Sequence, residues 1–136
     1  MRVQAIPRTE FRFQQANATG LAEASIPLAT RIDTSRIVSG AVGVRLHSKS
    51  WSATSSFTVK VYNVSYTGDE PSVVYRDTTA VATVTIAAGD VAPKLYTATL
   101  SNPIGDQIQV VLDWTHGATT DTQTFAISVE LELRDS

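Results

Sequence analysis

The stretch "QTFAISVELELRD", residues 123–135, alternates apolar and polar side chains along most of its length. Successive side chains of a β-strand point to opposite faces of a sheet, so a period of two predicts a strand with one face in a core and the other in water. Five apolar side chains occupy every second position of this stretch: Phe125, Ile127, Val129, Leu131 and Leu133.

The same alternation recurs along the chain between turns that are rich in Gly, Pro, Asn and Asp. No window of helical length sustains an amphipathic helical period. We therefore expect an all-β fold, an antiparallel jelly-roll-like β-sandwich of about eight or nine strands, with an immunoglobulin-like sandwich as the rival topology. The remaining predicted strands are 10–16, 23–29, 40–48, 56–67, 72–76, 80–87, 94–100 and 107–115.

The phase of the alternation also predicts which side chains form the core. We expect one face of each of four long strands to be buried, and Trp114 is in phase with one of those faces. The predicted core residues are Val42, Val44, Leu46, Phe57, Val59, Val61, Ile108, Val110, Leu112, Phe125, Ile127, Val129 and Leu131.

Length and composition restrict the class of protein. A chain of 136 residues is expected to form one domain, residues 1–136, in which residues 1–30 could be a partly extended N-terminal arm. The 11 basic and 13 acidic residues are scattered, which argues against a nucleic-acid surface. There is no Cys, and neither a signal peptide nor a membrane segment is recognisable at the start of the chain.

The carboxylates Glu130 and Glu132 are the strongest catalytic candidates in the sequence. Two residues apart on one strand face, they would lie roughly 7 Å from each other, between the spacings of retaining and inverting glycosidases. A catalytic acid, however, needs a pKa raised by burial or by close like charge, and these two residues fall on the face predicted to be solvated. We therefore interpret them as a soluble outer face and expect no catalytic residues.

Other chemistry has little support in the sequence. The two histidines, His47 and His116, are not accompanied by a nucleophile motif. No calcium-loop, zinc or phosphate-loop spacing occurs, so we expect no cofactor and no metal site.

Six further side chains are predicted to contact a partner. They fall at strand ends or opposite the predicted core, where aromatic residues serve either as anchors of a protein interface or as a sugar-stacking platform. The candidate interface residues are Trp51, Tyr62, Val64, Tyr66, Tyr75 and Tyr96.

Most of residues 37–135 resembles the small β-sandwich structural proteins of tailed-phage virions, such as head decoration or cement proteins and minor structural components. The resemblance lies in the alternation of Thr and Val, without Cys and without an active-site motif. It is carried by the stretches "VGVRLHSKSW", "SFTVKVYNVSYTGDEPSVVY", "ATVTIAAGDVAPKLYTATLSNPIGDQIQVVLDWT" and "FAISVELELRD". It implies a non-enzymatic virion protein, assembled in the host cytoplasm, that binds a capsid shell or neck and forms homo-oligomers. The alternatives are a carbohydrate-binding module and, third, a glycosidase-like hydrolase.

Overall fold

The computed structural model describes residues 1–15, 23–67 and 73–135, and only the backbone of residues 65–67 and 73–76. The described residues form nine β-strands and no helix. Accordingly, this part of the chain contains no helix capable of crossing a membrane. The strands are β1 (Arg2–Phe13), β2 (Glu23–Asp33), β3 (Ile37–Lys49), β4 (Ser56–Thr67), β5 (Val73–Arg76), β6 (Ala82–Ile86), β7 (Lys94–Thr99), β8 (Gln107–Thr115) and β9 (Gln123–Asp135).

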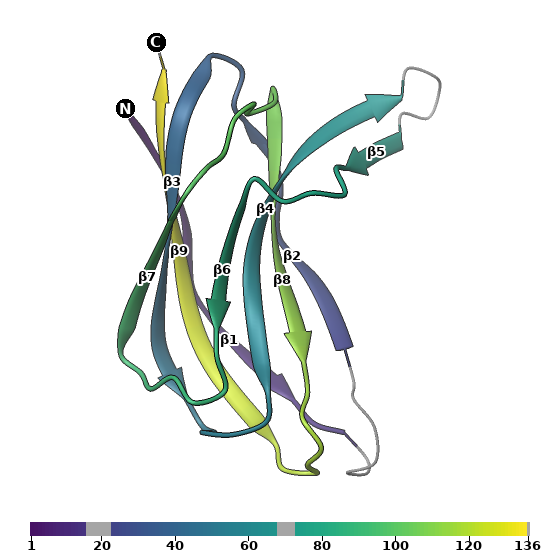
Figure 1. Cartoon of the computed structure of the whole chain (residues 1–136), viewed down its shortest axis with the longest axis vertical. Coiled ribbons are helices and arrows are strands. Elements are labelled where there is room, and N and C mark those ends of the chain that lie inside the picture. Colours follow the sequence, from purple (N-terminus) through teal and green to yellow (C-terminus); the bar gives the residue numbers. More distant parts are fainter. Residues whose placement is uncertain (16–22, 68–72, 136) are drawn as a thin grey trace.

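The strands belong to two antiparallel sheets that run along the long axis of the molecule (Figure 1). Sheet A has the order β1-β9-β3-β7. Sheet B has the order β2-β8-β4, and β4 then pairs with β6 along its first half and with β5 along its second half. The core lies between the two sheets.

The pairing of the strands is nested. β1 pairs with β9, β2 with β8, β3 with β7 and β4 with β6, while β5 stands outside this scheme. Consecutive strands from β1 to β4 and from β6 to β9 therefore alternate between the sheets, which is the arrangement of a jelly roll. The predicted jelly-roll-like sandwich is confirmed, and the immunoglobulin-like alternative does not describe this topology.

The core confirms the predicted strand phase. All thirteen predicted core side chains are buried, and Trp114 is only 2% exposed. Aromatic rings fill the end of the core near the start of β9, where Phe125 stacks on Phe57 at a centroid distance of 4.1 Å and Phe13 stacks on Trp114 at 4.6 Å. Burial of such rings removes large apolar surfaces from water and is a major part of the stability of the sandwich.

The N-terminal residues differ from the prediction. β1 begins at Arg2 rather than at residue 10, and β1 and β2, which fall largely within the predicted arm of residues 1–30, pair with β9 and β8 in the two sheets. β1 is an exposed edge strand with a register shift between Ile6 and Thr9. Its apolar residues therefore do not keep one phase, and the alternation that reveals a half-buried strand is lost.

Candidate functional site

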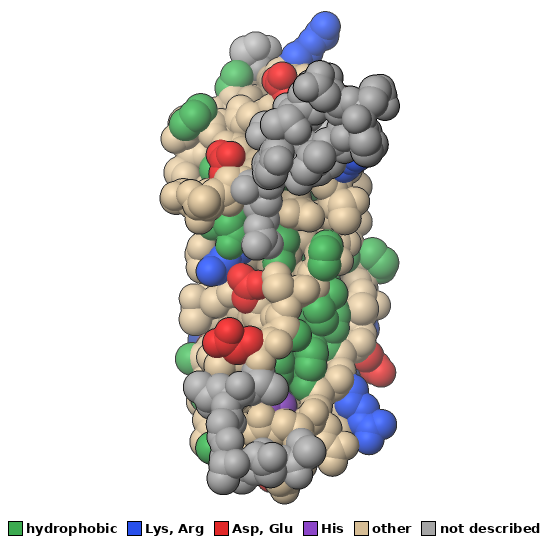
Figure 2. All heavy atoms as spheres, turned by 90° about the vertical axis from the view of Figure 1, so that its right-hand side faces the viewer, with side chains coloured by type: hydrophobic (Ala, Val, Ile, Leu, Met, Phe, Trp, Pro, Cys, Tyr) green, Lys and Arg blue, Asp and Glu red, His purple; other side chains and the backbone are tan. Residues whose placement is uncertain are grey.

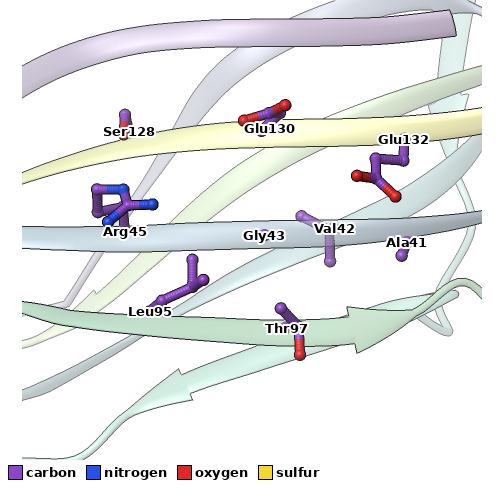
Figure 3. Close-up of a pocket in the computed structure, with 9 residues that line it drawn as sticks. All are labelled: Ala41, Val42, Gly43, Arg45, Leu95, Thr97, Ser128, Glu130 and Glu132. Atoms are coloured by element: carbon purple, nitrogen blue, oxygen red, sulfur yellow. The ribbon is translucent and has the colours of Figure 1, made fainter.

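The outer face of sheet A carries a shallow depression, which we call the trough. Its volume is about 210 Å³. Figure 3 shows its side chains on three adjacent strands, β9, β3 and β7. The residues that line it are Ala41, Val42, Gly43, Arg45, Leu95, Thr97, Ser128, Glu130 and Glu132.

The register of the strands builds the trough. Gly43 lies between Glu130 of β9 and Thr97 of β7, and Ala41 lies beside Glu132 one step further along β3. Residues directly opposite each other share a sheet face, so small side chains on β3 lie next to longer ones on β9. The floor is low because Gly43 has no side chain.

Glu130 and Glu132 are exposed on this face, as predicted for a solvated strand surface. They lie at one side of an open trough and are not enclosed in a cleft. Both side chains are open to solvent and are not buried in apolar surroundings. Their geometry is that of surface carboxylates available to a partner.

His47 and Ser128 also meet on the outer face of sheet A. His47 Nε2 lies 2.8 Å from Ser128 Oγ, and both side chains are half-buried. A serine nucleophile would also need a group that orients the other imidazole nitrogen. Within the described part of the chain, His47 Nδ1 has no such hydrogen-bond partner. We interpret the pair as a cross-strand contact that orders the surface beside Arg45.

Trp51, predicted to contact a partner from a strand end, is half-buried. Its ring packs edge-on against Trp114 at 5.1 Å and against Phe125 at 5.6 Å, and its Nε1 donates a hydrogen bond to the Ser55 carbonyl at 2.8 Å. The indole thus closes the aromatic end of the core while its polar atom is satisfied.

Tyr62 and Val64 fall on the predicted outer face of β4, but both are only 7% exposed. Val111, on the neighbouring strand and also out of phase with the core, is 1% exposed. The outer surface of sheet B is therefore locally close-packed, and Tyr62 and Val64 do not form an open patch. The period of two could not reveal this burial.

Tyr96 was also predicted to face outward, and it points inward instead. Its partner in the register is the buried Val44, and its hydroxyl donates a hydrogen bond of 2.8 Å to Asp90 Oδ2. Burial, and then the Asp90 carboxylate, raise the pKa of Tyr96 well above its ordinary value. The hydrogen bond from Tyr96 in turn lowers the pKa of Asp90.

Lys49, at the end of β3, binds the loop between β6 and β7, which contains Asp90. Its Nζ donates to the carbonyls of Trp51, Ala88 and Asp90 at 2.7, 2.6 and 2.8 Å, and partial burial lowers the pKa of Lys49. With all three protons of the ammonium used, Lys49 is a structural clamp. No local motif in the sequence marked it, because its partners lie up to 41 residues away.

The side chains of Tyr66 and Tyr75 lie outside the described residues. The described candidates for a sugar-stacking platform, Trp51, Tyr62 and Tyr96, are buried or half-buried. The large hydrophobic side chains that are exposed in the described chain, Met1, Val3, Val38, Val91 and Leu95, include no aromatic ring. The carbohydrate interpretation therefore gains no support from these positions.

A second apolar surface follows the side of the sandwich that carries β2, where hydrophobic side chains gather in a strip (Figure 2). β1 and β2 are the edge strands of the two sheets, and half-buried Phe11, Phe13, Ile26 and Leu28 pack from them against the core. β1 contains Pro7 and one register shift, and β2 contains Pro27 and two register shifts. These features discourage the addition of another strand.

His116 is 1% exposed at the end of β8, and its Nδ1 lies 2.9 Å from the Gly117 carbonyl. Its Nε2 has no hydrogen-bond partner in the described chain. Groups of three or more His, Cys, Asp or Glu that could hold a metal ion do not occur among the described residues.

Comparison with known proteins gives a match of fold. No family model and no curated protein matches the sequence. A chain in the structure of infectious bursal disease virus, Gx strain, is similar over 96% of this chain, with 17% identity and a TM-score of 0.50. The corresponding values for the Gt strain of the same virus are 96%, 16% and 0.47.

The present chain spans about a third of those viral chains, 30% and 32% of their lengths. At 17% identity the Gx likeness establishes a shared β fold and transfers no functional residue. The jelly roll found in the strand pairing thus also occurs, as part of a longer chain, in a virus structure.

Proposed function

We propose that this protein is a non-enzymatic structural component of a virus particle, one that binds a protein shell or neck through an outer sheet face. The narrower form of the proposal, from the resemblance of the sequence, is a decoration or minor structural protein of a tailed phage, assembled in the host cytoplasm. Two findings support it: the jelly-roll topology, which is common among viral capsid domains, and the likeness of fold to a chain of a virus structure.

The single observation that carries the proposal is the outer face of sheet A. It presents an open trough, with Leu95 54% exposed on β7 and Val3 48% exposed on β1. Exposed apolar side chains on a broad, open face, with charged groups between them, suit contact with another protein surface better than enclosure of a small substrate. Because a fold alone does not specify a function, this face gives the proposal its physical basis.

The candidate residues Tyr66 and Tyr75 remain proposed partner contacts, since they lie in paired strands β4 and β5. Tyr62 and Val64 are not proposed as direct contacts, because both are buried in the chain by itself.

The test is direct detection in particles. Virus particles from a culture that carries this gene would be banded on a density gradient, and the peptides of each fraction quantified by mass spectrometry. The proposal expects this chain in the particle band at a fixed ratio to the major shell protein. Its presence only in the soluble fractions, with the major shell protein in the band, would contradict the proposal.

A further inference from the structure

The isolated fold gives no reason for a glycine at position 43. Glycine weakens the interior of a strand unless it serves a bulge, a left-handed backbone or a close approach. The register of β3 runs without a shift from Ala41 to Leu46, and Gly43 does not have a positive φ. A Cβ at Gly43 would lie no closer than 3.8 Å to any other atom, which is ordinary van der Waals contact.

Gly40, on the same strand, is different. A Cβ at that position would lie 2.8 Å from the Glu132 carbonyl oxygen and 3.0 Å from Leu100 Cδ1, so the fold itself requires glycine there. The absence of a side chain at Gly43 leaves space only toward the outside, above the trough. We take this as a sign that something approaches the strand closely at this point.

The charges around the trough are also unmatched. Arg45 is exposed on β3, and Glu130 and Glu132 are exposed on β9. Within the described part of the chain, none of the three has an oppositely charged side chain at ion-pair distance. A surface that carries unpaired groups of both signs beside each other is complementary to a rotated copy of itself.

We propose that the trough is the contact between two copies of this chain, packed face to face through their A sheets. The two-fold axis runs along the strands, between β3 and β9. The rotation exchanges these two strands, so Glu130 and Glu132 of one copy lie over Gly43 and Ala41 of the other. The residue that faces Glu130 of the other copy is Gly43, and Arg45 lies two residues further along β3, roughly 7 Å away. The long side chain of Arg45 can span that distance.

The same rotation exchanges the two outer strands of the sheet, β1 and β7. The exposed apolar side chains Val3 and Leu95 stand on these strands, so the contact covers both of them. Four strands about 4.8 Å apart, over about eight residues, give a face of roughly 500 Å² per copy. A total near 1,000 Å² is at the low end of specific interfaces, so the isolated pair is weak and gains strength from repetition in an assembly.

This inference rests on the proposed function and narrows it: in the particle, the protein surface that the outer face of sheet A contacts is that of a second copy. The contact with the shell or neck is then left to the paired strands β4 and β5, which carry the candidates Tyr66 and Tyr75. The inference is tested separately. Sedimentation equilibrium of the full chain from about 5 to 500 μM measures self-association. Wild type is expected to form dimers within this range. Gly43→Val, which fills the trough, is expected to weaken dimerisation at least tenfold while its melting temperature stays the same or rises. Thr85→Glu, on the exposed face of sheet B, is the matched control and keeps the wild-type dimer.

Charge reversal tests the geometry. Arg45→Glu and Glu130→Arg each place like charges at both contacts of the pair, so each variant alone is expected to be monomeric. An equimolar mixture of the two variants restores both contacts and is expected to form heterodimers. A mixture that stays monomeric, or a Gly43→Val chain that dimerises like wild type, overturns the proposal. If wild type is monomeric at 500 μM while the chain is found in particles, this inference fails and the proposed function stands.

Discussion

Two alanine substitutions on β3 should have opposite effects on stability. At Gly40 the new Cβ would meet the Glu132 carbonyl oxygen at 2.8 Å and Leu100 Cδ1 at 3.0 Å. Crowding of this kind in a packed interior costs about 1–3 kcal/mol. At Gly43 the nearest atom is 3.8 Å away, so no crowding arises. Replacing glycine by alanine there should stabilise the fold by about 0.5–1 kcal/mol, because the unfolded chain loses conformational freedom.

The predicted difference between the two variants is therefore roughly 1.5–4 kcal/mol in the free energy of unfolding. Urea denaturation followed by tryptophan fluorescence measures it, since Trp114 lies in the core cluster and Trp51 packs against that cluster. The measurement should be made at a concentration where wild type is monomeric, so that the contact between copies does not contribute. If Gly43→Ala destabilised the monomer as much as Gly40→Ala, the fold itself would require the glycine, and the reasoning about the trough would be refuted.

Further predictions concern the two faces of β9 and the hydrogen bond between Tyr96 and Asp90. Leu131→Ala should lower the free energy of unfolding by about 2–5 kcal/mol through lost burial and a cavity. Glu132→Gln should change it by no more than about 0.5 kcal/mol. Equal losses for the two variants in urea denaturation would mean that the predicted inner and outer faces of β9 are exchanged. The folded state lowers the pKa of Asp90, chiefly through the hydrogen bond from Tyr96, so the stability that Asp90 contributes is present above its ordinary pKa and is lost as the pH falls through the lower folded value. Tyr96→Phe, which lacks this hydrogen bond, should therefore lose less stability than wild type as the pH falls. Thermal melts at a series of acid pH values measure this, and the same loss in both proteins would contradict it.

The sequence predicted the orientation of side chains best in strands that have one buried face and one solvent-exposed face. The alternating side chains of β3, β4, β8 and β9 were assigned to the correct faces because burial on one side imposes a strict period of two. That pattern depends only on the strand itself. It was therefore sufficient to predict the thirteen core residues and the class of the fold.

The orientation of the aromatic side chains could not be predicted in the same way. Tyr96 points inward because β7 pairs with β3 in the register that places it opposite Val44. Trp51 follows the end of a strand and turns into the core to pack with Trp114, a residue 63 positions away, which no local pattern indicates. The trough was missed for a related reason, because its walls come from β3, β7 and β9 and only the topology brings them together. The one local sign was a glycine within the alternating stretch 40–48.

The measurement that tests the account most directly is the accessibility of the outer face of sheet A in the assembled state. The chain has no cysteine, so a thiol introduced by Thr97→Cys, beside the trough, or by Thr85→Cys, on sheet B, reacts uniquely with maleimide. Both threonines are exposed. We predict that association slows labelling of the thiol at position 97 at least tenfold relative to the dilute monomer and leaves labelling at position 85 unchanged. Equal labelling rates at position 97 in the monomer and in the assembly would contradict the claim that this face is the contact surface.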